Sequence, residues 1–302
     1  MKFGIDFLCN CAREYPLKLK NYDLNQIIKK AVTVPKKTTL LDLRAMLLRY
    51  KISRIIVAEN EKPLGIVTEK DLIKAIYLGN KSIENTRVSE IMVKRLITAS
   101  EDSTIHDCAR LMINNKISSV IILKKDGKLA GIVTKTDLTS VFLTQSASLL
   151  QISKIMTRHV TTVKPADSLL YVENVLVKNR LSRVVVERNR KPVGIITHRD
   201  FIPAKIPLWL RQSGDPKEVE KYRMAAKPTE LKLNQLNYLS SFIAADIMTP
   251  NPVTVQVTED VSEASLLMIR NGISGLPVVK NSLLVGIITK TDIVKAIASE
   301  SP

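Results

Sequence analysis

The apolar and polar positions of the chain follow one pattern that occurs four times. In the first copy, a short β-rich stretch around Thr33 precedes apolar residues at helical spacing over residues 40–50, and an apolar run over residues 55–57 follows. Spacing by three and four residues is typical of an amphipathic helix, whereas a short apolar run between polar turns is typical of a buried strand. A further strand then ends in Gly-apolar-apolar-Thr, and a second helix is predicted to begin directly after that threonine.

The same order can be followed in the other three copies. Their buried strands are predicted at residues 120–122, 184–186 and 277–279, and polar turns such as residues 125–128 lead into the glycine-containing strands. Each copy therefore predicts the order β-α-β-β-α. The fold class that follows is mixed α/β (α+β), built from four small units.

The glycine-containing strand and the start of the next helix are almost identical in the four copies. The glycines lie 66, 63 and 92 residues apart, and a threonine precedes them by 32, 33, 32 and 32 residues. Such self-similarity at domain spacing identifies internal repeats. The repeated sequences are Gly65-Ile-Val-Thr68-Glu-Lys-Asp71, Gly131-Ile-Val-Thr134-Lys-Thr-Asp137, Gly194-Ile-Ile-Thr197-His-Arg-Asp200 and Gly286-Ile-Ile-Thr289-Lys-Thr-Asp292.

A unit of about 55–60 residues is marginal as an independent core, so we expect the copies to pair. Neighbours along the chain are the natural partners, copy 1 with copy 2 and copy 3 with copy 4. The insertion between copies 3 and 4 is rich in proline and lysine, and we expect a partly helical surface segment there. The predicted boundaries are an N-terminal segment (1–23), copy 1 (24–80), copy 2 (86–146), copy 3 (150–202), the insertion or linker (203–240) and copy 4 (241–299).

The net charge is unusual for an otherwise ordinary globular composition. Hydrophobic residues make up 45% and charged residues 25% of the 302 residues, but 46 Lys and Arg against 29 Asp and Glu give +17. This excess favours an anionic partner: a nucleotide phosphate, a nucleic acid, an acidic protein or a membrane surface. Aromatic residues make up only 4%, which is poor material for stacking on single-stranded nucleic acid.

Several classes of protein are disfavoured by the sequence. The motifs of P-loop nucleotide hydrolases, esterases and zinc proteases are missing, so we expect no catalytic residues and no enzyme. No apolar run reaches the roughly 18–20 residues that span a bilayer, and the first residues lack a secretory signal, so we expect a cytoplasmic protein without a membrane partner. Cysteines and histidines are not spaced as metal ligands, which predicts no metal site: Cys9, Cys11, Cys108, His106, His159 and His198.

The Thr-x-x-Asp sequence after each glycine, called the box here, has two interpretations. As a capping box, the threonine and the aspartate satisfy backbone amides at the start of the second helix, and no ligand is needed. As a ligand site, the carboxylate holds ribose hydroxyls, while free amides and basic residues attract phosphate and the glycine permits a close backbone approach. The basic residues inside the boxes are Lys70, Lys135, His198, Arg199 and Lys290.

A position just before each buried strand differs among the copies. Copies 1 and 3 have Arg54 and Arg183, whereas copies 2 and 4 have Ser119 and Gly275. A guanidinium can bind phosphate through two hydrogen bonds, but it can equally be a solvated side chain at a strand edge. The difference argues against full occupancy of four sites.

Taken together, these sequences resemble cystathionine-β-synthase (CBS) domains, small β-α-β-β-α modules that pair into Bateman modules. The resemblance extends from about residue 24 to residue 298. Four copies in one chain are similar in layout to the gamma subunits of AMP-activated protein kinase and their archaeal relatives. The resemblance implies a pseudo-symmetric disc of two Bateman modules that binds an adenosine-containing ligand in clefts between paired units.

The resemblance also implies roles for individual residues. Ribose binding is implied for Asp71, Asp137, Asp200 and Asp292, and phosphate binding for Arg54, Arg183 and the five basic box residues named above. The first threonine of each copy is also a good strand residue, so a purely structural role stays open for it. The threonines that the resemblance places in the pocket are Thr33, Thr68, Thr98, Thr134, Thr162, Thr197, Thr254 and Thr289.

The function that follows is that of a regulatory adenine-nucleotide sensor, in which the ligand shifts the paired units and so biases an unknown protein partner. AMP, ADP and ATP are the expected ligands, S-adenosylmethionine is a further candidate, and a homodimer stays open. Two alternatives also stay open: a nucleic-acid-binding protein that uses the +17 charge, and a scaffold with empty clefts. The basic residues are dispersed and form no nucleic-acid-binding motif, which favours the sensor.

Overall fold

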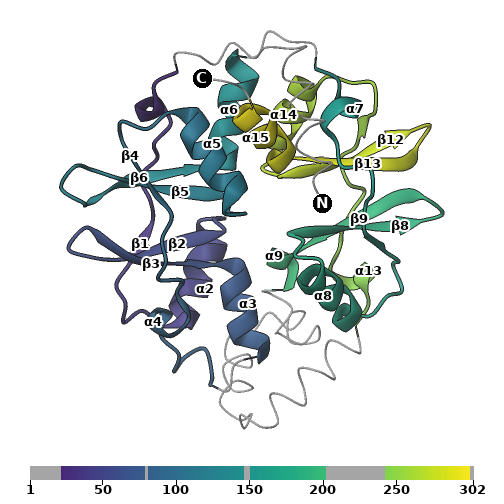
Figure 1. The fold of residues 1–302 in the computed structure, drawn as a ribbon. Coiled ribbons are helices and arrows are strands. Elements are labelled where there is room, and N and C mark those ends of the chain that lie inside the picture. The colour runs from purple at the N-terminus through teal and green to yellow at the C-terminus, as the bar shows by residue number, and fades with distance from the viewer. Residues whose placement is uncertain (1–21, 79–80, 146–149, 202–241, 300–302) are drawn as a thin grey trace. The chain divides into compact units, whose positions relative to one another are not determined.

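Each of the four copies folds in the predicted order of strands and helices (Figure 1). The computed structural model describes residues 22–78, 81–145, 150–201 and 242–299. The prediction of a mixed α/β fold with four small units is confirmed. Copy 1 contains β1 (Thr33–Val34), α2 (Leu40–Arg49), β2 (Arg54–Glu59), β3 (Lys62–Thr68) and α3 (Glu69–Leu78), and the short helix η1 (Leu24–Gln26) precedes it.

Copies 2 to 4 repeat this order, and each of them begins with a one-turn helix. Copy 2 contains α4 (Val88–Ile91), β4 (Thr98–Ser100), α5 (Ile105–Asn114), β5 (Ser119–Leu123), β6 (Leu129–Thr134) and α6 (Lys135–Gln145). Copy 3 contains α7 (Ile152–Ile155), β7 (Thr162–Val163), α8 (Leu169–Lys178), β8 (Arg183–Arg188), β9 (Lys191–Thr197) and α9 (His198–Phe201). Copy 4 contains α13 (Ala244–Ile247), β10 (Thr249–Pro250), β11 (Val255–Gln256), α14 (Val261–Arg270), β12 (Gly275–Lys280), β13 (Leu283–Thr289) and α15 (Lys290–Ser299).

Every copy builds its own small sheet with one topology. The first strand runs parallel to the second, with a helix as the crossover, and the second forms an antiparallel hairpin with the third. In this register the box threonine at the end of the third strand lies opposite the first residue of the second strand, as Thr68 lies opposite Arg54. Because of this register, the residue that begins the second strand, such as Arg54, lies beside the box of the same copy.

The opening segment of each copy, ahead of the first strand of its own sheet, pairs with the sheet of another copy. One residue of that segment bridges to the residue that follows the repeated glycine, so the segment lies along the glycine-containing strand. The bridged pairs are Lys29 with Ile132, Val93 with Ile66, Thr157 with Ile287 and Thr249 with Ile195. Copies 1 and 2 exchange such segments with each other, and so do copies 3 and 4.

The chain forms two compact units, and each unit combines alternate copies. We call them the odd unit, with copies 1 and 3, and the even unit, with copies 2 and 4. One buried apolar cluster joins Leu72 of copy 1 to Phe201 of copy 3, and a second joins Phe142 of copy 2 to Ile297 of copy 4. The odd unit comprises residues 32–94 and 161–251, and the even unit comprises residues 1–31, 95–160 and 252–302.

The predicted pairing of neighbouring copies is present in the exchanged segments, and alternate copies in addition share a hydrophobic core. The reason lies in the amphipathic helices, which bury their apolar faces against helices of the alternate copy. In the even unit, α5 and α6 pack against α14 and α15, and in the odd unit α3 packs against α9. Neighbouring copies are connected by the exchanged segments, whereas alternate copies share the hydrophobic core.

The predicted insertion at 203–240 and the pair Cys9 and Cys11 lie outside the described residues. Cys108 is a buried free thiol in α5, and burial raises its pKa to about 12, as expected for a packed and unreactive cysteine. In the described part of the chain, no helix combines the length and the apolar character that crossing a membrane requires.

Candidate functional site

All four boxes form the carboxylate half of a capping box at the start of the second helix, and in copies 1 and 2 the backbone N–H of the aspartate also donates to the threonine hydroxyl over 3.4 Å. In each copy, Oδ2 of the aspartate accepts hydrogen bonds from the backbone N–H and the hydroxyl of the threonine. The N and Oγ1 atoms of Thr68 lie 2.9 and 2.6 Å from Asp71 Oδ2, and those of Thr197 lie 2.6 and 2.9 Å from Asp200 Oδ2. Asp137 and Asp292 are held in the same way. The capping role is therefore present in every copy, and it uses only one of the two carboxylate oxygens.

The second carboxylate oxygen divides the copies into two pairs. In the even unit, Asp137 Oδ1 lies 2.5 Å from Lys29 Nζ, and Asp292 Oδ1 lies 3.6 Å from Lys295 Nζ. Both aspartates are buried, with 2% and 4% of their surface exposed. In the odd unit, Asp71 and Asp200 are only half-buried, and no lysine or arginine among the described residues is within ion-pairing distance of them. Among the described residues, the Oδ1 atoms of these two aspartates are engaged in no ion pair, and we call them available in this sense.

A further capping box lies at the start of α5, away from the candidate site. The N and Oγ1 atoms of Thr104 lie 3.0 and 2.6 Å from Asp107 Oδ2, which matches the boxes after the glycine strands. The hydrogen bonds from the Thr104 side chain and backbone hold the pKa of Asp107 below its ordinary value. This box begins the first helix of copy 2, and no repeated glycine precedes it. It is therefore a matched internal control.

In the odd unit, the starts of α3 and α9 bring acidic and basic side chains together. Arg199 Nε of copy 3 donates a hydrogen bond to Glu69 Oε1 of copy 1 over 2.7 Å. Burial nevertheless raises the pKa of Glu69, although Arg199 and then Arg54 act in the opposite direction. Burial also raises the pKa of Asp200. The carboxylates are thus partly withdrawn from water, where interactions with a polar ligand are stronger than at an open surface.

His198 lies at the same place, at the first position of α9. Burial lowers the pKa of its imidazole, a backbone hydrogen bond with Ser182 opposes this shift, and the charge of Lys70 lowers the pKa further. Its Nε2 is buried without a hydrogen-bond partner in the described part of the chain. The shift favours a neutral imidazole, which is a weaker phosphate partner than the imidazolium.

The two arginines of the sequence prediction lie beside the boxes of the odd unit. Arg54 and Arg183 are the first residues of β2 and β8, and each lies opposite the box threonine of its copy. Both side chains are half-buried and hydrogen-bond to the serine that precedes them. In the even unit, the same place opposite the box is occupied by Ser119 and Gly275. An arginine and an available aspartate therefore occur in the same two copies.

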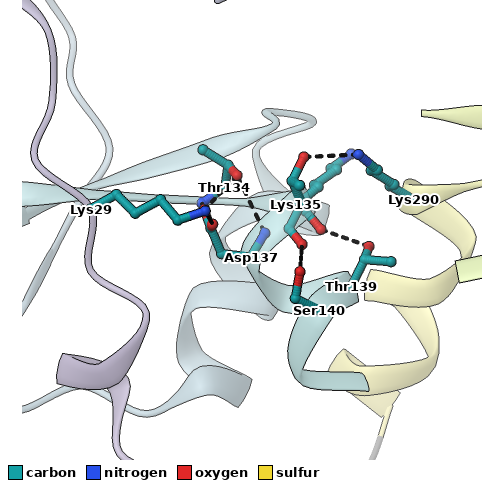
Figure 2. A network of polar contacts seen from close by, with 8 residues as sticks. Lys29, Thr134, Lys135, Asp137, Thr139, Ser140 and Lys290 are labelled. Carbon is teal, nitrogen blue, oxygen red and sulfur yellow. Dashed lines mark hydrogen bonds and ion pairs between the residues drawn. The ribbon is translucent and has the colours of Figure 1, made fainter. Parts of the chain in front are cut away.

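The basic box residues of the even unit have a different environment, which Figure 2 shows. Lys135 Nζ of copy 2 donates to Thr291 Oγ1 over 2.8 Å, and Lys290 Nζ of copy 4 donates to Thr136 Oγ1 over 3.0 Å. Lys290 is only 5% exposed. The structure places these two predicted phosphate ligands in a reciprocal contact between α6 and α15.

The first threonines of the four copies are not equivalent in their surroundings. Thr98 and Thr162 are half-buried, whereas Thr33 and Thr254 are exposed. Thr254 lies outside β11, which begins one residue later than the equivalent strands. The cause is Pro277, which stands where Ile56 donates its N–H to the first strand in copy 1; proline has no N–H to donate. The proline was the sequence signal for this difference.

The repeated glycines have a packing role that sequence reasoning missed. A Cβ on Gly65 would lie 2.6 Å from Sδ of Met92, which belongs to the segment exchanged from the next copy. Gly194 and Gly286 accommodate methionines of the same kind, and at Gly131 the nearest atom is the Lys29 carbonyl oxygen. The glycines therefore admit the exchanged segment. The predicted close backbone approach exists, but its occupant is the chain itself.

The CBS domain family model matches residues 23–78, 88–144, 152–206 and 244–299. These matches cover most of the sequence, and the chain belongs to the CBS-domain family. The repeat unit, the exchanged segments and the boxes described above are thus those of four CBS domains in one chain.

Two archaeal proteins are similar over nearly the whole chain. MJ1225, an uncharacterised protein of Methanocaldococcus jannaschii, is 26% identical over 289 residues, which cover 89% of this chain and 96% of MJ1225. Its crystal structure, described as that of a proposed archaeal homologue of the AMPK gamma subunit, matches with a TM-score of 0.77 at 24% identity over 91% of this chain and 99% of that one. A conserved protein of Pyrococcus horikoshii matches with a TM-score of 0.59 at 19% identity, over 91% of this chain and 99% of its own. Both structures share the fold.

Enzymes also contain related copies. The homoserine O-acetyltransferase of Methanohalobium evestigatum is 28% identical over 126 residues, which cover 41% of this chain but only 25% of the enzyme. The similarity therefore extends to a quarter of that enzyme's length.

Proposed function

We propose that the protein is a regulatory adenine-nucleotide-binding protein whose principal sites lie in copies 1 and 3. A carboxylate accepts hydrogen bonds from ribose hydroxyls, and a guanidinium binds phosphate through two parallel hydrogen bonds. The observation that carries the proposal is the coincidence of an available aspartate Oδ1 with an arginine opposite the same box. Asp71 and Arg54 meet this condition in copy 1, and Asp200 and Arg183 meet it in copy 3.

The nature of the base is supported by family membership. The four-copy layout resembles that of the AMPK gamma subunits, and this resemblance implies an adenosine-containing ligand. The charge of the odd-unit site supports a phosphorylated ligand over a bare nucleoside. The basic side chains gathered there are Arg54, Lys70, Arg183 and Arg199, and the acidic ones are Glu69, Asp71 and Asp200.

Signalling to a protein partner is the second part of the proposal. The ion pair between Glu69 and Arg199 connects copy 1 to copy 3, and Arg54 lies close enough to Glu69 to influence its pKa. A phosphate bound by Arg54 brings negative charge next to Glu69 and changes the balance of this contact. A ligand that interacts differently with two arrangements shifts their populations, and a partner that recognises one of them reads the change.

Calorimetric titration with AMP, ADP, ATP, S-adenosylmethionine and adenosine, each at low and at high salt, tests the proposal. We expect phosphorylated adenine nucleotides to bind with a stoichiometry above one and adenosine to bind more weakly, because it has no group for the arginines. Silence across the panel would contradict the proposal. Tight binding to duplex DNA that weakens steeply with salt, together with that silence, would instead assign the function to the +17 charge.

A further inference from the structure

One residue of each exchanged segment occupies an equivalent place next to the box. These residues bridge to the position that follows the repeated glycine, and the box threonine lies two residues further along the same strand. The residue is Val93 for copy 1, Lys29 for copy 2, Thr249 for copy 3 and Thr157 for copy 4. Copy 2 alone has a lysine there.

The backbone of Lys29 is firmly held. Lys29 N donates to Ile132 O over 3.1 Å, and Ile132 N donates to Lys29 O over 2.9 Å. A Cβ on Gly131 would lie 2.5 Å from the Lys29 carbonyl oxygen, so the segment is packed directly on the strand. From this anchor the side chain extends to the box, as Figure 2 shows, and Nζ lies 2.5 Å from Asp137 Oδ1.

We propose that Lys29 is an affinity-determining residue that closes the copy 2 site by occupying the carboxylate oxygen that would otherwise hold a ribose. This inference rests on the proposed function, because it assigns a state to one of the proposed sites. The ammonium forms an ion pair with Asp137 Oδ1, at the carboxylate oxygen that a ribose hydroxyl would approach, and it adds a charge that a ribose lacks. It is also part of the chain, so it competes at a high effective concentration.

The stem of Lys29 can leave the site without disturbing the core. The Lys29 side chain is 66% exposed, whereas that of Asp137 is 2% exposed. The Lys29 side chain can therefore move into solvent and leave the buried Asp137 carboxylate accessible. The equivalent Val93 cannot pair with Asp71, whose Oδ1 stays available in copy 1.

Two reciprocal substitutions test this inference. AMP binding to each full-length variant is measured by calorimetry. Lys29→Val gives copy 2 the residue of copy 1, and Val93→Lys gives copy 1 the residue of copy 2. Lys30→Val is the control, because it removes the same charge from the neighbouring position, where the exposed lysine forms no ion pair among the described residues. Val93 is exposed, so its replacement leaves the fold intact, and thermal unfolding shows whether Lys29→Val does so as well.

We expect Lys29→Val to add one AMP site and Val93→Lys to weaken or remove one, with a loss of affinity of about tenfold or more at that site. Lys30→Val leaves the stoichiometry unchanged. If the wild type binds AMP and neither exchange alters the number or affinity of sites, the role of Lys29 is refuted while the proposed function stands. If the wild type binds no nucleotide, the proposed function itself fails, and this inference fails with it.

Discussion

At the scale of single residues, the two oxygens of each box aspartate have separate roles. Oδ2 caps the helix in every copy, whereas the environment of Oδ1 differs between the odd and the even unit. Asp71 and Asp200 leave Oδ1 available, but Asp137 and Asp292 direct it to lysines. The same sequence motif therefore caps the helix in every copy, but its second carboxylate oxygen is paired with a lysine only in the even unit.

The repeated glycines give a residue-scale prediction. Gly131→Ala should lower the free energy of unfolding by about 1–3 kcal/mol, and Gly65→Ala should lower it by less. The reason is the neighbour that the new Cβ would meet. At Gly131 this is the Lys29 carbonyl oxygen at 2.5 Å, which is fixed backbone, whereas at Gly65 it is Met92 Sδ at 2.6 Å, at the flexible end of a side chain.

Denaturant unfolding of the two variants and the wild type measures this difference. Equal losses, or a larger loss for Gly65→Ala, would show that the exchanged segment is not packed on copy 2 as described.

The residue-level chemistry was only partly predictable from sequence. The Thr-x-x-Asp pattern is a known cap signature, so the Oδ2 contacts followed from it directly. The partner of Asp137 could not be read in the same way, because Lys29 belongs to the opening segment of copy 1 and reaches copy 2 only through the exchange of that segment. Glu69 was missed for a similar reason, since its partner Arg199 belongs to copy 3.

At the scale of elements, hydrophobic periodicity predicted the strands and helices of each copy well. The one-turn helices α4, α7 and α13 were not predicted, because four residues are too few to show a helical period. The sequence pattern also did not predict which helices pack against each other. All four copies have an amphipathic helix with a similar apolar face, and a local pattern shows which face is buried but not against which copy.

The shared cores give an element-scale prediction. Phe142 and Phe201 are the fully buried phenylalanines of the even and the odd core. Phe142→Ala leaves a cavity and should cost about 3–5 kcal/mol. Hydrogen exchange should show the resulting loss of protection in α14 and α15 of copy 4, and much less in copies 1 and 3.

Phe201→Ala is the matched variant, and it should lower protection in copy 1 instead. Loss of protection that followed chain neighbours, from copy 2 to copy 1, would contradict the assignment of cores to alternate copies.

At the scale of the whole molecule, the sequence predicted four CBS units and their repeat, and family membership confirms these units. The chain passes repeatedly between the odd and the even unit, so neither unit is a continuous piece of sequence. The division also separates the chemistry. The odd unit combines available aspartates with arginines, whereas the even unit combines buried aspartates with lysines.

The central claim is that a nucleotide is held by the box aspartates of the odd unit. The most direct test compares AMP affinity and unfolding free energy in Asp71→Ala, Asp200→Ala and Asp107→Ala, with Asp107 as the capping residue away from the site. All three variants should lose about 1 kcal/mol of stability with the cap. We predict that Asp71→Ala and Asp200→Ala also lose AMP affinity by about tenfold or more, while Asp107→Ala binds AMP as the wild type does. Equal stability losses with unchanged AMP affinity in all three would show that the box aspartates are helix caps and nothing more.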